Sequence, residues 1–466
     1  MTQQPLASNS APALNASAAP QRPAQKTPKR IARTILNALK GGVVPRIGLP
    51  YIAVGRKAEI DALLGDVEIV AEGGAAFRFI VGKYGSGKSF LMQTIRSYVM
   101  DKGFAVADAD LSPERRLQGS KGQGLATYRE LMQNLATKTM PEGGALPLIL
   151  DRWIGRIRTE AAAAGAAPES PAFASEVRRR IYEAVGSLSE VVHGFEFAKL
   201  LVRYADADAA GDDAEKAKIL RWFRGEYALK SEAKAELGTS LIVTDDTWYD
   251  FVKVLARFLK GAGYAGLILF IDELVNLYKI PQSISRNYNY EKILTMYNDT
   301  LQGKARWLGI IMGGTPQCVE DQRRGLYSYE ALKSRLADGR FSREGLRDLY
   351  SPVIHLEPLT IEELLVLVGK LAQMHADLYG APNRLSDADL AEFLRIEFAR
   401  VGADSHITPR EIIRDFIELL NLLVQHPDLT LASLMSSQDF QYAKPDGNPE
   451  AEAAAGGSDD FAEFDL

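Results

Sequence analysis

The stretch Gly82-Lys83-Tyr84-Gly85-Ser86-Gly87-Lys88-Ser89 decides the fold of this 466-residue chain. It matches the pattern GxxxxGK[ST] and lies between the apolar run 77–81, which predicts a strand, and residues 90–99, whose apolar spacing predicts a helix. Glycines let such a loop fold tightly, so that its backbone N–H groups face phosphate oxygens, and the helix N-terminus adds its dipole. We therefore predict a phosphate-binding loop. The alternative is a glycine-rich turn beside a surface lysine.

Two side chains of this loop carry the expected chemistry. Lys88 is predicted to supply a point charge to the β- and γ-phosphates of ATP, and the Ser89 hydroxyl is predicted to ligate Mg²⁺. The other loop residues are predicted to bind the nucleotide as well: Gly82, Lys83, Tyr84, Gly85, Ser86 and Gly87.

A second stretch, Leu267-Ile-Leu-Phe-Ile271-Asp272-Glu273, is a pure apolar run that ends in two carboxylates. Burying carboxylates at the end of such a strand is costly unless a cation is present. We expect Asp272 to hold Mg²⁺, directly or through water, and Glu273 to orient and polarise the water that attacks the phosphate. The alternative is that both acids only cap a helix over 274–278.

Four further residues are candidates for contacts with the nucleotide. Thr315 follows a predicted strand and would sense the γ-phosphate or help to place water, unless it belongs to an ordinary Gly-Thr-Pro turn. Arg410 lies in the first turn of a predicted helix, where a cation opposes the helix dipole by roughly 0.3–1 kcal/mol unless a phosphate is near. Arg335 and Arg340 are candidates for an arginine finger that completes a neighbouring subunit's site. For the three arginines, the alternative is solvated surface charge.

Continuous apolar runs without alternation indicate strands buried on both faces, and hence an α/β fold with a parallel sheet covered by helices. We predict a disordered basic arm over 1–30, an α/β nucleotide-binding domain over 31–359, a helical lid over 360–435 and a disordered acidic tail over 436–466. A charged, alanine-rich segment at about 140–240 is predicted to be a helical insertion in the α/β domain. It would account for the long separation of Lys88 from Asp272, since a βαβ unit needs only about 30 residues.

Composition excludes several classes of protein. With 55 Lys+Arg against 60 Asp+Glu, the chain is not a histone-like basic protein. The single cysteine, Cys318, excludes an intrachain disulfide framework and a cysteine-based zinc cluster, and the five histidines form no HxxxH pair. No stretch reaches the ~18 uncharged apolar residues of a membrane helix, and the N-terminus lacks the apolar region of a secretory signal. We expect a soluble cytoplasmic protein that does not contact membranes.

Charge is unevenly distributed along the chain. Residues 1–40 contain six bases and no acid, whereas residues 445–466 contain seven acids and no base. Both ends could simply be solubilising tails. The other interpretation of the acidic tail is that Phe461 and Phe464 dock on a partner protein. Contact with DNA would involve the basic arm or the clusters Glu114-Arg-Arg116 with Lys121 and Arg178-Arg-Arg180, unless these bases are solvated faces.

Taken together, these motifs resemble an AAA+ ATPase of the oligomeric P-loop type. Residues 82–89 resemble Walker A and residues 267–273 resemble Walker B, and Thr315 occupies the sensor 1 position. Residues 408–410 resemble the start of the superfamily's sensor 2 helix. The adenine-side motif of that superfamily is similar to four residues: Val54, Gly55, Arg56 and Glu59. The resemblance implies ATP with Mg²⁺, hydrolysis, and a homo-oligomer.

More narrowly, residues 38–45 (Ala-Leu-Lys-Gly-Gly-Val-Val-Pro), which lead into Val54-Gly55-Arg56, and residues 263–267 (Gly-Tyr-Ala-Gly-Leu) resemble the BREX phage-defence ATP-binding proteins of the BrxC and BrxD family. This resemblance covers roughly residues 31–430. It implies an ATPase whose subunits assemble around ATP and act on DNA or a DNA-processing partner in anti-phage or anti-plasmid defence. No clear winged-helix pattern follows the lid. The alternative from another class is a nucleotide-dependent signalling switch or scaffold with little turnover, and a metabolic kinase is more distant.

Overall fold

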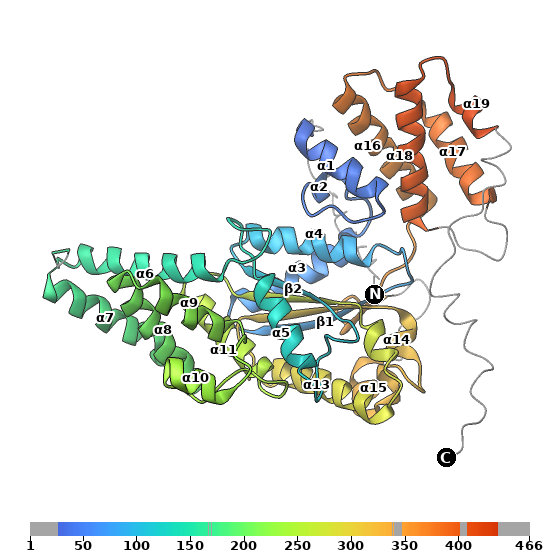
Figure 1. The fold of residues 1–466 in the computed structure, drawn as a ribbon. Helices are drawn as coiled ribbons and strands as arrows, with labels where there is room; N and C mark the ends of the chain where they lie inside the picture. Colours follow the sequence, from blue (N-terminus) through green and yellow to red (C-terminus); the bar gives the residue numbers. More distant parts are fainter. Residues whose placement is uncertain are drawn as a thin grey trace, which may run out of the picture.

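The computed structural model describes residues 27–165, 167–168, 170–337, 339, 347–400 and 408–436. Arg340 and nearly all residues of the two predicted tails lie outside these ranges. The described residues form a central sheet with helices on both faces, a group of helices that extends to one side, and a helical module above the sheet (Figure 1). None of the helices in these ranges is long and apolar enough to cross a membrane.

Five parallel strands form one sheet in the order β2-β3-β4-β1-β5. The strands are β1 (Ala75–Val81), β2 (Ala105–Asp110), β3 (Leu267–Asp272), β4 (Leu308–Gly314) and β5 (Val353–His355). The predicted α/β class with a parallel P-loop core is therefore confirmed. Because all five strands run the same way, their carboxyl ends meet at one edge, where ligands bind in open α/β sheets.

Alternating side chains of each strand enter two different cores. Ile268 and Phe270 of β3 face α3 (Lys57–Ala71) and α4 (Lys88–Asp101) on one side of the sheet. Leu267, Leu269 and Ile271 enter the core of the other side, together with helices α5 (Gln123–Gln133), α11 (Trp248–Gly261) and α13 (Ser283–Leu301). Burial on both faces explains the unbroken apolar runs of the sequence.

The region predicted as an insertion folds into helices that project from the side of the sheet (Figure 1). Its elements are α6 (Leu146–Ala163), α7 (Pro171–Gly186), η1 (Ser187–Glu190), α8 (Gly194–Ala210), α9 (Asp213–Phe223) and α10 (Lys230–Leu237). Their apolar faces share the large core, in which Phe197 stacks at a tilt on Phe223 and Trp222 packs edge-on against Phe251 of α11. The insertion thus continues the sheet's own core.

The helical module contains the segment predicted as a lid and also two helices from the start of the chain. It is built from α1 (Lys29–Lys40), α2 (Leu49–Ile52), α16 (Ile361–Tyr379), α17 (Asp387–Arg400), α18 (Pro409–Gln425) and α19 (Leu431–Met435). This differs from the predicted division, which placed residues 1–30 in a disordered arm and residues 31–359, with most of α1 and all of α2, in the nucleotide-binding domain. Lys29 and Arg30 are helical, and α1 buries Ala32, Ile35 and Leu36 against the module.

Candidate nucleotide-binding site

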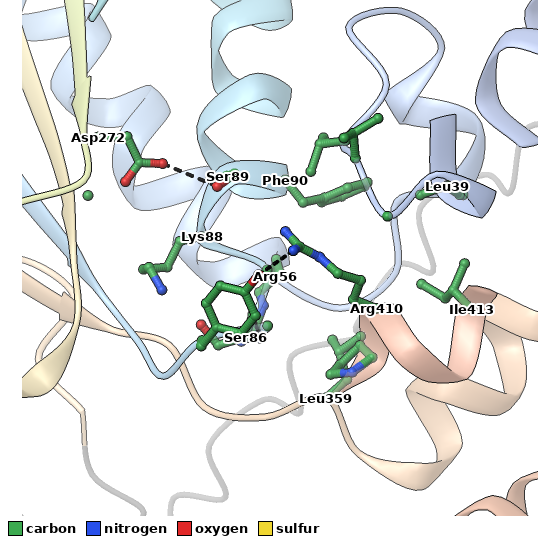
Figure 2. Close-up of a pocket in the computed structure, with 18 of the residues that line it drawn as sticks. Leu39, Arg56, Ser86, Lys88, Ser89, Phe90, Asp272, Leu359, Arg410 and Ile413 are labelled. Carbon is green, nitrogen blue, oxygen red and sulfur yellow. Dashed lines mark hydrogen bonds between the residues drawn. The ribbon is translucent and has the colours of Figure 1, made fainter. Parts of the chain in front are cut away.

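A cleft lies between the carboxyl edge of the sheet and the helical module, with about 1290 Å³ of empty space including its open mouth. Its polar wall comes from the phosphate loop and the ends of β3 and β4. Its apolar wall comes mainly from Leu39, Val44, Ile52, Val54, Leu367 and Ile413. Figure 2 shows Lys88, Ser89 and Asp272 at one end of the cleft, and Leu39 and Ile413 at the other. One end suits phosphates, and the other suits a flat apolar base.

The phosphate loop connects β1 to α4, as the sequence predicts. Gly85 and Gly87 have left-handed backbone angles, with φ of 75° and 88°, and Gly87 is the N-cap residue of α4. Such angles are costly for residues with a Cβ atom. Lys88 Nζ donates hydrogen bonds to the carbonyl oxygens of Gly82 (2.8 Å) and Lys83 (3.1 Å), so its ammonium lies against the loop it is predicted to serve.

Ser86 supports the assignment of this loop to phosphate binding. Its side chain is buried, and its Oγ atom has no hydrogen-bond partner among the described residues. A buried hydroxyl without a partner is uncommon and indicates a group that a ligand satisfies. A phosphate oxygen is a suitable acceptor, and the residues present therefore fit ATP.

Ser89 and Asp272 meet across the cleft. Ser89 Oγ donates a hydrogen bond of 3.1 Å to Asp272 Oδ2, and the backbone N–H of Glu273 donates one of 2.8 Å to Asp272 Oδ1. A hydroxyl beside a carboxylate is a donor set that suits Mg²⁺, which usually takes one or two carboxylates together with substrate phosphates. Nowhere in the described ranges do three or more His, Cys, Asp or Glu residues gather as a metal site.

Glu273 has a strained backbone, with a left-handed φ of 62°. Such a conformation costs about 1–3 kcal/mol in a residue other than glycine, and it is concentrated at functional sites. The acids are less buried than the sequence suggests, because Asp272 is half-buried and Glu273 is exposed to the cleft. The helix that follows is α12 (Val275–Tyr278), and its N-cap residue is Leu274, so Glu273 is not its cap.

Thr315 lies directly after β4, the strand between β1 and β3. It is 9% exposed and lines the cleft together with Asp272 and Glu273. It also begins the short helix α14 (Pro316–Glu320), and its backbone N–H donates a hydrogen bond of 3.2 Å to Cys318 Sγ. This position in the cleft, at the end of β4, fits the predicted role at the γ-phosphate, and it also fits the alternative of an ordinary Gly-Thr-Pro turn.

Arg56 connects the adenine-side motif to the phosphate loop. Its guanidinium donates to the carbonyl oxygens of Ser86 (3.0 Å) and Glu357 (2.5 Å) and lies 3.6 Å from Glu59. Burial lowers the pKa of Arg56, and the Glu59 carboxylate opposes this shift. Val54 lines the cleft, and a Cβ atom on Gly55 would lie 2.5 Å from Glu363 Oε1. The motif is therefore packed against the start of α16.

Arg410 reaches from α18 to the phosphate loop (Figure 2). Its guanidinium donates a hydrogen bond to the Tyr84 hydroxyl and lies 5.0 Å from the centre of the tyrosine ring. Thr408 and Glu411 form a capping box at the start of this helix. The loop and the helix touch, since a Cβ atom on Gly85 would lie 2.6 Å from Thr408 Cβ.

The structure places Arg335 outside the cleft of its own chain. It is exposed on α15 (Glu330–Leu336), where it donates hydrogen bonds to Ala331 O (2.6 Å) and Asn298 Oδ1 (3.2 Å). This position is compatible with a role in a neighbouring subunit and also with surface charge. Arg340 lies outside the described residues.

Sequence reasoning missed Asp110. This last residue of β2 pairs in register with Asp272, so the two side chains lie on the same face of the sheet at its carboxyl edge. Burial and the neighbouring Asp272 carboxylate raise the pKa of Asp110. The sequence offers only a weak signal for Asp110, an acid at the end of the short run Ala105–Asp110, because the same run also contains Asp108.

Comparison with known proteins agrees with this geometry. No curated protein sequence matches the chain. The family model of the BREX system ATP-binding protein BrxC/D matches residues 27–439, which include the phosphate loop, the acidic strand and the helical module. With a match over most of its length, the chain belongs to the BrxC/D family of BREX system ATP-binding proteins.

Proposed function

We propose that the protein hydrolyses ATP with Mg²⁺, assembles as a homo-oligomer and acts on DNA or a DNA-processing partner in BREX defence. The observation that carries this proposal is the joining of Ser89, Asp272 and Glu273 at the end of the phosphate loop. These residues supply a ligand pair for a cation and, beside it, a second acidic residue that lines the cleft. A protein that only bound ATP would need the two cation ligands, Ser89 and Asp272, but not Glu273.

Binding would begin at the phosphate loop. The backbone N–H groups of the loop and the Ser86 hydroxyl would donate to phosphate oxygens, and the Lys88 ammonium would exchange its carbonyl partners for them. The apolar end of the cleft would take the adenine. Ser89 and Asp272 would hold Mg²⁺, which neutralises charge on the β- and γ-phosphate oxygens when bound.

Hydrolysis would depend on Glu273. Glu273 is exposed and lines the cleft just after β3, and its carboxylate would accept a proton from the attacking water and orient that water toward the γ-phosphate. Thr315, from the neighbouring strand, would help to hold the water or the γ-phosphate. Arg410 would add positive charge from α18, and Arg335 would act in the site of a neighbouring subunit.

The second candidate function is a nucleotide-dependent switch or scaffold that recruits an effector and turns over slowly. Exposed Glu273 argues against this class, because a pure scaffold has no use for a carboxylate in a strained conformation beside the metal ligands. The acidic tail, which would recruit a partner protein, lies outside the described residues.

Steady-state ATP turnover with and without DNA separates the two functions. The proposal expects multiple turnovers that DNA or a partner stimulates, together with a larger particle by light scattering when a non-hydrolysable ATP analogue is bound. Tight ATP binding without turnover under every condition would favour the scaffold instead.

A further inference from the structure

Helix α1 exposes a basic face that the nucleotide site does not use. Its apolar side chains Ala32, Ile35 and Leu36 are buried against α16 and α18. The helix contains no acid, and its bases are all exposed: Lys29, Arg30, Arg33 and Lys40. The apolar face fixes the helix on the module and so holds these bases in place on its outer side.

The bases of α1 differ from the other basic clusters in their partners. None of the four forms an ion pair within the described ranges. In α7, by contrast, Arg178 pairs with Asp206 (2.8 Å), and both Arg179 and Arg180 pair with Glu176 (2.7 Å each). Acids within the insertion therefore neutralise its arginine cluster.

The loop after β2 is also partly neutralised. Its Arg115 lies 3.1 Å from Glu130 of α5. Three basic regions could contact DNA: α1, the loop after β2 and the arginine cluster of α7. Among the described residues, α1 is the region in which every base lacks a neutralising acid. The whole chain has a net charge of -5, so the positive charge of α1 is opposite in sign to that of the molecule as a whole.

The spacing of the bases suits a row of phosphates. At 3.6 residues per turn, Lys29, Arg33 and Lys40 fall within an arc of about 40°, and at 1.5 Å per residue they extend over about 16 Å. Duplex DNA presents one charge per ≈ 1.7 Å of its axis, so such a row meets phosphates in any register. The exposed polar Asn37 lies beside this row, about 40° further round the helix than Arg33, and adds a hydrogen-bond donor of the kind that contacts DNA backbones.

Helix α1 also leads directly into the nucleotide cleft. Leu39 in its last turn and the next residues Gly42, Val43 and Val44 line the cleft. Gly42 lies against Arg410, since a Cβ atom on it would be 3.6 Å from Arg410 Cδ. A ligand that shifts or rigidifies α1 would therefore change the wall that contacts the nucleotide.

We propose that the exposed basic face of α1 binds the phosphate backbone of DNA, and that this binding is coupled to nucleotide binding through Leu39 and residues 42–44, which line the cleft. This inference rests on the proposed action on DNA and adds its contact surface. A membrane is a poorer fit than DNA, because the apolar face that would enter lipid is already buried in the module. An acidic peptide would match the charge but not the regular spacing.

The test compares two triple variants of the full-length protein. Lys29→Gln/Arg33→Gln/Lys40→Gln removes three unpaired charges, and Arg178→Gln/Arg179→Gln/Arg180→Gln removes three paired ones as a matched control. Glutamine has a helix propensity close to those of lysine and arginine, so both helices should persist. Binding of a fluorescent DNA duplex is measured over a series of salt concentrations, with and without a non-hydrolysable ATP analogue.

Each phosphate contact contributes about 0.9 to the steepness with which log Kobs falls as log salt concentration rises. The slope of the α1 variant should therefore be shallower than that of the wild type by up to about 2.7. The control should keep the wild-type slope. DNA should change the affinity for the analogue in the wild type, and the analogue should change the affinity for DNA by the same factor. Both effects should vanish in the α1 variant, while its ATP turnover without DNA stays normal.

Wild-type DNA binding with an unchanged slope in the α1 variant, or an equal loss in the control, would overturn the inference and leave the proposed function intact. Absence of DNA binding by the wild type would instead remove the proposed direct action on DNA and the inference together. Preferential binding of the wild type to polyglutamate or anionic vesicles would also overturn the inference, and would assign α1 to an acidic protein or a lipid surface.

Discussion

Ser89 Oγ lies 3.1 Å from Asp272 Oδ2, and a hydrogen bond joins these two residues across 183 positions of sequence. The sheet makes this contact possible, because β4 alone separates the strand that precedes Ser89 from the strand that ends in Asp272. The helical insertion leaves the sheet after β2 and returns before β3, and its helices project on the side away from the helical module (Figure 1). A long insertion therefore does not disturb the site.

Lys88→Ala should abolish ATP binding while leaving the fold intact. The lysine donates to carbonyl oxygens of its own loop and is not part of the apolar core, so its loss removes the positive charge that phosphates need. Titration with a fluorescent ATP analogue measures the affinity, and far-UV circular dichroism checks the fold. Wild-type affinity in a folded variant would refute the assignment of the phosphate loop.

Gly313→Ala should impair Mg²⁺-dependent ATP binding. A Cβ atom at this position would collide with Asp272 Oδ1, so the carboxylate would have to leave its place beside Ser89. The matched control is Gly155→Ala in α6, where a Cβ atom meets nothing within 4 Å and where alanine favours the helix by about 1 kcal/mol. The Mg²⁺ concentration for half-maximal binding should rise several-fold in the first variant alone. An equal Mg²⁺ concentration for half-maximal ATP binding in both variants would mean that Asp272 does not hold the metal.

Arg335→Ala should bind ATP normally and hydrolyse it poorly if the arginine acts in a neighbouring site, where such residues contribute about 10³–10⁵-fold. Mixing it with Lys88→Ala should partly restore turnover, because each subunit supplies what the other lacks. Lys333→Ala on the same helix serves as the control and should have wild-type activity. Failure to recover activity in mixtures that exchange subunits would exclude action in trans.

His375 should make the helical module sensitive to acid. Burial lowers the pKa of His375 below its usual value of about 6.5, and Asn421 Oδ1, at 3.0 Å from its Nε2, only partly opposes this. As pH falls below about 6.5, the unfolded chain binds a proton before the folded chain does, so the free energy of unfolding falls; above that pH it is unaffected. The protection factors of amide hydrogens in α16 and α18, which are corrected for the slower intrinsic exchange at low pH, should fall between pH of about 6.5 and 5, and less so in His375→Gln. Identical pH dependence in the two proteins would contradict this origin.

The nucleotide loop and the acidic strand could be predicted because their signals are local. Glycine spacing, an apolar run and the residues that end it specify Lys88, Ser89 and Asp272 without knowledge of distant contacts. The capping box of Thr408 and Glu411 is local in the same way.

Features that depend on which surfaces meet could not be predicted. The amphipathic pattern of α1 shows that one face is buried, but it does not show that the lid helices cover that face. Asp110 joins the site through the register between β2 and β3, and Gly313 through a close approach to Asp272; neither relationship leaves a pattern in the sequence. Likewise, the sequence shows that Glu176 is spaced to pair with Arg179 and Arg180, but it does not show that Asp206 of α8 neutralises Arg178.

If Glu273 is the catalytic base, as we propose, ATP turnover depends on its carboxylate, and the substitution Glu273→Gln removes that group alone. The amide has nearly the same shape as the carboxylate, so the fold and the Ser89–Asp272 contact should survive, and only the proton acceptor is lost. Turnover should fall by about 10²–10⁴-fold while ATP affinity is unchanged or tighter. Glu72→Gln, at an exposed position after α3, should retain wild-type turnover. Turnover of Glu273→Gln within about threefold of wild type would contradict the account, since a general base contributes at least about 10²-fold.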